Sequence, residues 1–259
     1  MRLKYSIILT ISLAVLLAAG MASALDLVVV PETAQRQAGN PVRVQIWAEN
    51  ASAIISMGIK VSFDPAVLQA TAAAKNEDFT NGFLMDADGD SGTTGDQFVT
   101  PVVEIDNTAG TVMMIGGRLI GDSTTGLGPQ VLLGWIDFNP VANGSTNLSV
   151  DLAHNTASFV NFAGLPSGDS QDPGSLPSNL SWIYVGDDAC EADYNADFKV
   201  DALDASQFRS DFGAADCLNP GNICLADGNG DGKVDALDAS IFRGDFGRPD
   251  TGTNSCPQP

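Results

Sequence analysis

The chain has 259 residues, a formal net charge of −20 and a single histidine. So strong a negative charge argues against nucleic acid and against anionic membrane surfaces as partners. The one histidine, His154, cannot build a Ser-His-Asp triad or a histidine-rich metal site, and the scattered glutamates show no catalytic spacing. We therefore expect a binding protein and not an enzyme, with room for one medium and one small domain.

The first 24 residues have the pattern of a secretory signal peptide. Arg2 and Lys4 precede an apolar run from 7 to 19, and Ala22-Ser-Ala24 supplies small residues at the cleavage positions. That run is shorter than the roughly 20 residues of a membrane span, and no later segment is long and apolar enough. We expect cleavage before Leu25 and a secreted mature chain without a membrane span. An uncleaved N-terminal anchor is the lesser alternative.

Residues 25–186 have the pattern of a mainly β domain. Short segments of alternating or β-branched residues are separated by turns that contain Gly, Pro and Asn, and no long amphipathic helix competes with them. The pattern indicates an immunoglobulin-like or jelly-roll β-sandwich, which a final strand closes after a long loop at 164–179. The predicted strands cover residues 42–47, 59–63, 102–105, 111–115, 131–136 and 181–185.

Four segments of this first module, at 38–46, 57–68, 110–114 and 128–138, resemble a cohesin, the receptor module of cellulosome-type scaffolds. The most specific are Phe-Asp-Pro-x-Val-Leu at 63–68 and Leu-Leu-Gly-x-Ile-x-Phe at 132–138. The resemblance implies a sandwich that receives the dockerin of another protein. Generic immunoglobulin-like adhesion and carbohydrate-binding sandwiches show similar patterns, and both remain alternatives.

The last part of the chain, 187–259, contains a duplicated acid-rich loop. The first copy, 193–204, reads DYNADFKVDALD, and the second, 227–238, reads DGNGDGKVDALD, so that each position recurs 34 residues later. Both copies run on into nearly the same helical sequence. Recurrence of the whole pattern at a constant offset argues against two chance acidic turns on the surface.

The acidic residues have the spacing of an EF-hand calcium loop. In such a loop, positions 1, 3, 5, 9 and 12 supply side-chain oxygens and position 7 supplies a backbone carbonyl. Donors that are all oxygen fit a hard cation and not a transition metal. We predict two Ca²⁺ ions, with both lysines contributing their carbonyls. The expected ligands are Asp193, Asn195, Asp197, Lys199, Asp201 and Asp204 in the first loop, and Asp227, Asn229, Asp231, Lys233, Asp235 and Asp238 in the second.

Two features depart from an ordinary EF-hand loop. The closing residue is Asp in place of Glu, and the glycine of the sharp turn, present as Gly232, is replaced by Phe198 in the first copy. Because a bulky residue at positive φ is costly, we expect the first site to bind more weakly or its loop to bend differently. A third acidic stretch, at Asp86, Asp88 and Asp90, lacks a closing carboxylate, and a solvated loop is favoured there.

All four cysteines lie in this second module. An even count in a small exported domain predicts disulfides. We favour Cys217–Cys224, between the repeats, and Cys190–Cys256, joining the ends, over one bridge within each repeat. The apolar anchors are few, so calcium and the disulfides are expected to order the module together. These anchors are Val200, Leu203, Phe208 and Phe212, with Val234, Leu237, Phe242 and Phe246 as counterparts.

The segment at about 190–250 resembles a type I dockerin. The resemblance depends on the single helix after each loop and on the pattern of the second copy, Asp-x-Asn-x-Asp-Gly-x-Val-Asp-x-x-Asp. The resemblance implies a pseudo-twofold pair of loop–helix units that grips a cohesin with one helix. For the leucines, core packing is the alternative role, and for the arginines it is solvation. By position, the partner-binding residues would be Ala202, Leu203 and Arg209 in the first copy, and Ala236, Leu237, Arg243 and Arg248 in the second.

The two resemblances together imply a secreted, non-catalytic adaptor that joins cohesin- or dockerin-bearing extracellular proteins, most often for polysaccharide degradation. Two other functions stay open: a carbohydrate-binding sandwich carried by a dockerin, and a polysaccharide hydrolase with a docking tag. Trp47 and Trp135 lie in apolar strands and are expected to be buried, which weighs against sugar binding. The poor supply of Glu and His weighs against a hydrolase.

Overall fold

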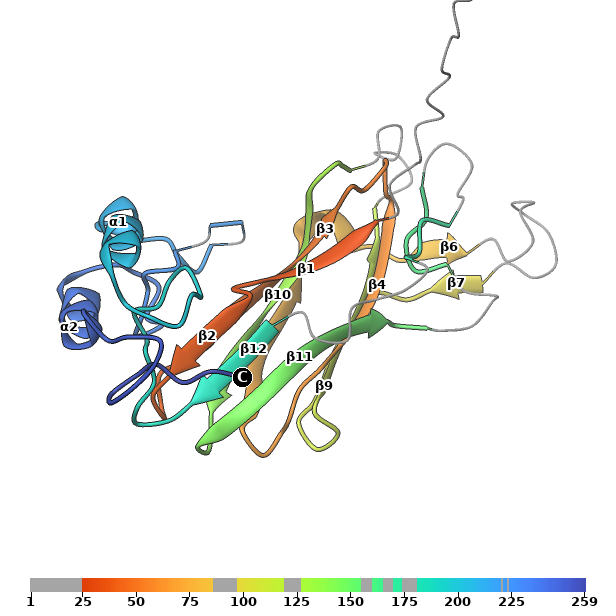
Figure 1. Cartoon of the computed structure of the whole chain (residues 1–259). Coiled ribbons are helices and arrows are strands. Elements are labelled where there is room, and N and C mark those ends of the chain that lie inside the picture. Colours follow the sequence, from red (N-terminus) through yellow and green to blue (C-terminus); the bar gives the residue numbers. More distant parts are fainter. Residues whose placement is uncertain are drawn as a thin grey trace, which may run out of the picture.

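The computed structural model shows two layers of strands with two helices at one side of them (Figure 1). The predicted signal peptide and the acidic stretch around Asp88 lie outside the residues that the structure describes. The described residues are 25–85, 97–118, 127–154, 160–164, 170–173, 181–219, 221–222 and 224–259. No helix among them is long and apolar enough to cross a membrane.

One layer is an antiparallel sheet of four strands in the order β1-β3-β10-β5. Its strands are β1 (Asp26–Val30), β3 (Val42–Glu49), β10 (Val131–Pro140) and β5 (Leu68–Lys75). Inward-facing residues alternate with outward-facing ones along each strand, so Val44 and Ile136 lie in the core while Trp47 and Trp135 are half-buried on the outer face.

The other layer has six strands in the order β2-β12-β11-β4-β9-β8. Only the β2–β12 pair is parallel. The strands are β2 (Thr33–Arg36), β12 (Ser181–Val185), β11 (Gly144–Leu152), β4 (Ser56–Ser62), β9 (Thr111–Gly117) and β8 (Val102–Asp106). A short 3₁₀ helix, η1 (Glu77–Phe79), and a two-stranded ribbon of β6 (Phe83–Met85) and β7 (Gln97–Val99) complete the module.

The structure confirms the predicted fold class, a β-sandwich followed by a small helical module. Each of the six predicted strands lies within or overlaps an observed one. The sequence patterns do not predict β1, β2, β5, β6, β7 or β11. Between the sheets lies one apolar core, in which Ile46, Met57, Leu133 and Phe138 are fully buried.

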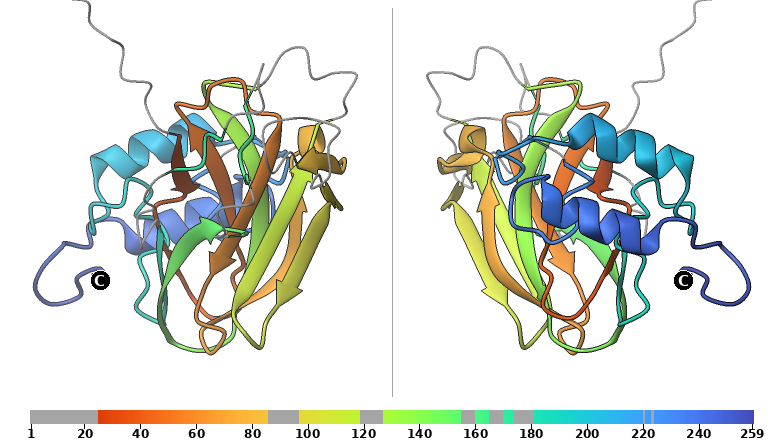
Figure 2. Two further views of the ribbon diagram at one scale, coloured as in Figure 1. Left: turned by 90° about the vertical axis from the view of Figure 1, so that its right-hand side faces the viewer. Right: turned by 90° about the vertical axis from the view of Figure 1, so that its left-hand side faces the viewer.

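The second module consists of the two acid-rich loops, each followed directly by a helix, α1 (Ala202–Asp211) or α2 (Ala236–Asp245). Figure 2 shows the two helices side by side, and Figure 1 shows that they lie at one side of the sandwich. The small core of the second module contains Val200 and Val234. The stacked rings of Phe208 and Phe242, whose centroids are 5.3 Å apart, pack against them. Both favoured disulfides, Cys190–Cys256 and Cys217–Cys224, are present.

Candidate calcium loops and docking helices

Each acid-rich loop starts its own helix with two of its aspartates. Asp201 accepts a hydrogen bond from the Leu203 N–H, and Asp204 accepts one from the Asp201 N–H, both at 2.8 Å. Asp235 and Asp238 form the same capping box at the same distances. The ninth and twelfth residues of each loop therefore satisfy the free N–H groups at the helix start.

The first aspartate of each loop closes the sharp turn. Asp193 accepts hydrogen bonds from the backbone N–H groups of Asp197 and Phe198, at 3.1 and 3.0 Å. In the second loop, Asp227 accepts the equivalent bonds from the fifth and sixth residues, at 3.1 and 2.9 Å. The two loops thus have the same internal geometry, even though their sequences differ at the turn.

The twelfth carboxylates point back into the loops and are fully buried. Asp204 accepts hydrogen bonds from the N–H groups of Tyr194 and Asn195, at 2.9 and 3.3 Å. Asp238 accepts the matching pair in the second loop, at 3.0 and 3.3 Å. Each loop therefore folds around its closing carboxylate, which accepts hydrogen bonds from the second and third residues of the loop.

Burial and crowding change the acidity of the first aspartates. Burial raises the pKa of Asp193 to about 6, and the nearby charges of Asp204 and Asp197 add to the rise. Burial likewise raises the pKa of Asp227 to about 6, helped by the charge of Asp238 and opposed by that of Arg36. A cation held in the loop would stabilise the charged form of these carboxylates.

The loop residues fit a hard cation in their donor chemistry. In the described part of the chain, no three His, Cys, Asp or Glu side chains gather as a metal-holding group; the carboxylates instead accept backbone hydrogen bonds. An EF-hand-type set also draws on an asparagine and a backbone carbonyl, and every donor in both loops is an oxygen. Ca²⁺ would supply the positive charge that the buried carboxylates require.

The turn residue of the first loop adopts the conformation that glycine takes in the second. Phe198 has a φ of +64° and Gly232 a φ of +89°. Two positions earlier, Ala196 and Gly230 have φ values of +60° and +71°. Of the two alternatives, a differently bent first loop is therefore wrong, and weaker binding stays a prediction. The loop keeps its shape with two non-glycine residues in the left-handed region, at a cost of roughly 1–3 kcal/mol each.

The lysines at the seventh position of the two loops behave differently. The ammonium group of Lys199 lies 3.2 Å from a carboxylate oxygen of Asp197 and 3.0 Å from one of Asp201. Among the described residues, no ion pair joins Lys233 to its own loop. The first loop thus carries a cation of its own beside two of the expected calcium ligands.

The helices expose a matched pair of apolar surfaces. Leu203 and Leu237 are 61% and 60% exposed, and Phe212 and Phe246 are 56% and 54% exposed. These four residues do not belong to the module's core, which corrects the prediction that they anchor it. The exposed set also includes Ala202, Arg209, Ala236 and Arg243.

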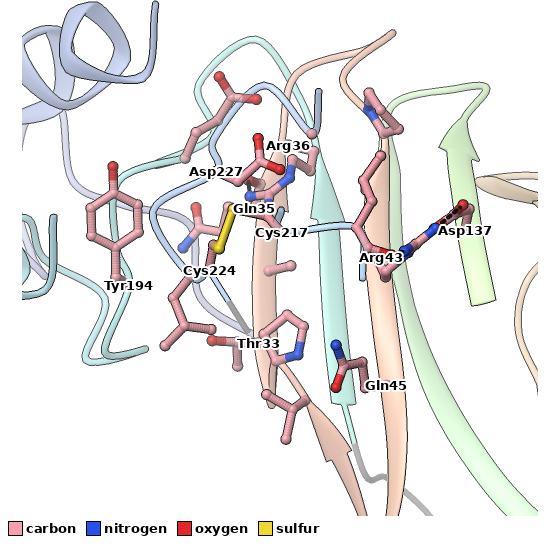
Figure 3. A pocket seen from close by; sticks show the side chains of 18 of the residues that line it. Thr33, Gln35, Arg36, Arg43, Gln45, Asp137, Tyr194, Cys217, Cys224 and Asp227 are labelled. Atoms are coloured by element: carbon pink, nitrogen blue, oxygen red, sulfur yellow. Dashed lines mark hydrogen bonds and ion pairs between the residues drawn. A yellow bond between two sulfur atoms is a disulfide. The ribbon is translucent and has the colours of Figure 1, made fainter. Parts of the chain in front are cut away.

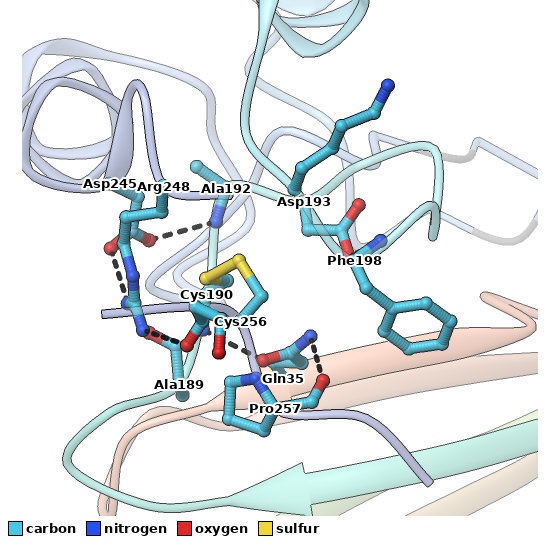
Figure 4. The surroundings of a disulfide bond; sticks show 12 residues. Gln35, Ala189, Cys190, Ala192, Asp193, Phe198, Asp245, Arg248, Cys256 and Pro257 are labelled. Atoms are coloured by element: carbon cyan, nitrogen blue, oxygen red, sulfur yellow. Dashed lines mark hydrogen bonds and ion pairs between the residues drawn. A yellow bond between two sulfur atoms is a disulfide. The ribbon is translucent and has the colours of Figure 1, made fainter. Parts of the chain in front are cut away.

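Arg248 differs from the other residues predicted to bind a partner. Its guanidinium donates to the Asp245 carboxylate and to the carbonyls of Asp188 and Ala189. These bonds hold the end of α2 beside the Cys190–Cys256 disulfide (Figure 4). The side chain is therefore committed to the module's own structure, a role that the motif alone does not reveal.

The second module matches a known family. Residues 191–244 match the family model described as Dockerin type I domain, which confirms the predicted dockerin-like module. A search of curated proteins finds no match.

The solved structures that match include cohesins and cohesin–dockerin complexes. CaCohA2 from Clostridium acetobutylicum is 18% identical, with a TM-score of 0.41 over 62% of this chain and 90% of that one. A type I cohesin–dockerin complex from Clostridium thermocellum has 10% identity and a TM-score of 0.43, covering 62% and 94%. A non-cellulosomal cohesin from Archaeoglobus fulgidus has 11% identity and a TM-score of 0.36, covering 62% and 91%.

Proposed function

We propose that this protein is a secreted, non-catalytic adaptor that assembles extracellular complexes by calcium-dependent cohesin–dockerin binding. Its partners are cohesin- or dockerin-bearing proteins, and the complexes serve the degradation of polysaccharides. The observation that carries the proposal is the pair of loop–helix units at a constant offset, with matching hydrogen bonds and equally exposed leucines and phenylalanines.

The second module supports the role of a plug. Two calcium ions, one in each loop, would hold the aspartates that also cap α1 and α2, so that metal binding and helix formation are coupled. Each helix presents one leucine before its closing aspartate and one arginine later, both exposed. Because the two surfaces match, either helix can dock, in orientations related by the pseudo-twofold.

The first module supports the role of a receptor. The cohesin-like segments at 38–46, 57–68, 110–114 and 128–138 coincide with β3, β4, β9 and β10, the central strands of the two sheets. The residues that carry the resemblance therefore build the sandwich itself. At the edge strand β8, Val103 and Ile105 are exposed on the face that they share with the core residues Met114 and Val112 of β9.

A pull-down from the source secretome tests the proposal. The full chain, with calcium or with chelator, serves as bait, and the captured proteins are identified by mass spectrometry. Leu203→Asp/Leu237→Asp should lose cohesin-bearing partners, while Val103→Asp, on the other module, should keep them. Capture of the same proteins in chelator, or by the double variant, would contradict calcium-dependent docking by these helices.

A carbohydrate-binding sandwich is the second candidate, and one observation favours it. Trp47 and Trp135, expected to be buried, are half-buried on the outer face of the four-stranded sheet, where they line a groove of about 730 Å³. The Trp47 indole N–H is buried without a hydrogen-bond partner. The Arg43 guanidinium lies 3.9 Å from the centre of the Trp135 ring, which leaves Trp47 as the ring for stacking. The amides of Asn76 and Gln130 line the same groove and already bond to Leu132 and Glu49, so a sugar would use their remaining hydrogen-bonding capacity.

Binding to insoluble polysaccharides tests this candidate. The full chain should sediment with the polymer, and Trp47→Ala should lower the binding affinity by up to about tenfold, since it removes the ring on which a sugar would pack. Val103→Ala, on the opposite sheet, is the matched control. Equal binding by wild type and by Trp47→Ala rules out sugar recognition in this groove.

A further inference from the structure

The two calcium loops differ from each other at three alternating positions. The second, fourth and sixth residues are Tyr194, Ala196 and Phe198 in the first loop and glycines in the second. Backbone hydrogen bonds within the loops do not account for this difference, because they match in the two copies. The second position packs within its own module, where Tyr194 stacks on Phe242. The sandwich accounts for a residue at each of the other two positions, because it contacts Phe198 of the first loop and Gly230 of the second.

The first loop contacts the sandwich through Phe198. Its ring lies edge-on to the Trp182 ring of β12, with centroids 6.1 Å apart and planes at 69°. Figure 4 shows the Phe198 ring directed toward the sandwich strands and away from the loop. Trp182 is nearly buried. The residue that is costly inside the loop is thus stabilised by an aromatic contact outside it.

The second loop contacts the sandwich through its backbone. A Cβ on Gly230 would lie 2.5 Å from the carbonyl oxygen of Pro41 and 2.8 Å from its ring. Only glycine permits so close an approach. The first loop has Ala196 at this position with a similar φ, so the loop conformation itself tolerates a side chain. It is the sandwich that requires glycine here.

Buried polar side chains connect the modules between these two contacts. Gln35 of β2 accepts a hydrogen bond from the Cys190 N–H at 2.9 Å and donates to the Pro257 carbonyl at 3.2 Å. Glu191 accepts bonds from the Gln37 N–H at 2.9 Å and from Asn40 at 2.8 Å. Gln35 and Glu191 are 3% and 4% exposed, so these bonds lie in an interior and not on a surface.

The segment between the repeats also lies on the sandwich (Figure 3). From β3, Arg43 donates to the Leu218 carbonyl and Gln45 to the Asn222 carbonyl. A cavity of about 200 Å³ remains between the modules, lined by buried polar atoms of Arg36, Gln45 and Tyr194 without a hydrogen-bond partner. Ordered water there would satisfy them, as in many wet interfaces.

We propose that the second module docks onto its own sandwich through both calcium loops, and that calcium binding closes this interface and fixes the two modules as one rigid body. The inference rests on the proposed calcium binding, and it adds a role for the loops besides shaping the helices. The exposed faces of α1 and α2 are then presented to a partner in a fixed orientation.

The coupling follows from the shape of the loops. Phe198 reaches Trp182, and Gly230 reaches Pro41, only when each loop holds its compact turn. Without a cation, the aspartates of each loop repel one another and oppose that turn. By linkage, if calcium favours docking, then docking raises calcium affinity by the same factor. Loss of either contact should weaken both.

Hydrogen exchange of the full chain tests the proposal. The N–H groups of Gln37 and Cys190 both bond across the interface. Calcium should slow their exchange by about tenfold or more relative to chelator. Gly230→Ala and Phe198→Gly should remove most of this protection and weaken calcium binding several-fold. Each variant introduces the residue that the other loop already has, so both loops should still fold.

Gly244→Ser is the matched control. It also introduces the residue of the other repeat, Ser210, but a Cβ on Gly244 meets no atom within 4 Å. Protection should be unchanged in this variant. Equal exchange of Gln37 and Cys190 with and without calcium, or full protection in Gly230→Ala, would overturn the docking proposal alone. Failure of the wild-type chain to bind calcium would instead contradict the proposed function.

Discussion

The two modules of this chain hold their folds by different means. The sandwich has a continuous apolar core between two sheets, with residues such as Ile46, Leu133 and Ile136 fully buried. The second module has a small core, two disulfides and two loops crowded with carboxylates. Burial of apolar surface is enough for the first module, whereas the second adds two disulfides to its small core and, as we propose, a bound cation in each loop.

This difference predicts which module should respond to calcium. A core of packed side chains does not respond to a metal ion, so the sandwich should be indifferent to calcium. The loops of the second module contain buried carboxylates and also start both helices. We therefore expect a change in calcium to act on the second module and on its contact with the sandwich, and to leave the sandwich folded.

Chelation under reducing conditions should give the largest difference in stability between the two modules. With both disulfides reduced and calcium removed, the helical signal of α1 and α2 in circular dichroism should disappear while the β signal persists. Neither the small core nor the repelling carboxylates can hold the helices alone. Chelator without reductant is the control and should give a smaller loss. A helical signal that survives both treatments contradicts this dependence.

Loss of a closing carboxylate should be the next largest effect. Asp238→Ala removes an expected ligand and half of a capping box, so the calcium affinity of the second loop should fall by at least about 100-fold, beyond the usual effect of residues around a metal site. Removal of the cap should also destabilise α2 by about 1 kcal/mol. Isothermal titration calorimetry measures the first effect and thermal unfolding the second.

Asp250→Ala is the control for this change, because Asp250 is exposed and lies outside both loops. It should leave both binding events intact. Asp204→Ala should produce the same loss in the first loop. If Asp238→Ala still binds two calcium ions with unchanged affinity, then the twelfth residue is not a ligand.

Acidification should stabilise the second module when it is metal-free and should weaken its binding of calcium. The folded pKa of Asp193 and of Asp227 is about 6, above the unfolded value of roughly 4. Between these values the folded, metal-free module holds protons that the unfolded chain has released, so lowering the pH from 7 to 4.5 should stabilise it. Protons compete with calcium at the same carboxylates, so calcium affinity should fall.

The magnitude follows from the titration. At pH 5, one unit below these pKa values, calcium affinity should be about tenfold lower than at pH 7.5 for each loop. Thermal unfolding at both pH values, with calcium and with chelator, checks the two signs in one series. A metal-free module that loses stability between pH 7 and pH 5 contradicts the raised pKa values.

Sequence predicts the two loop–helix units and the disulfides far better than it predicts the interface; the calcium ligands stay a prediction. The loops are local and repeated, so their spacing marks both loops and the helix after each one, whereas the helix-capping role of four of their aspartates emerges only from the structure. The strand β5 alternates only over its first four residues, and its run of alanines at 72–74 has no alternation to mark it. Contacts such as Glu191 with Gln37 join polar residues that are far apart along the chain, and no local pattern reveals them.

The lysines at the seventh loop position should give the smallest effect. Lys199→Ala removes an ammonium group that lies 3.0 Å from Asp201 and 3.2 Å from Asp197. Because an exposed ion pair contributes roughly 0–1 kcal/mol, calcium affinity of the first loop should rise by no more than about fivefold, and less at high salt. Lys233→Ala is the matched variant and should change the second loop less. Calorimetry at two salt concentrations measures both changes in calcium affinity. A fall in affinity for Lys199→Ala would show that the Lys199 ammonium group supports the loop and does not compete with the cation.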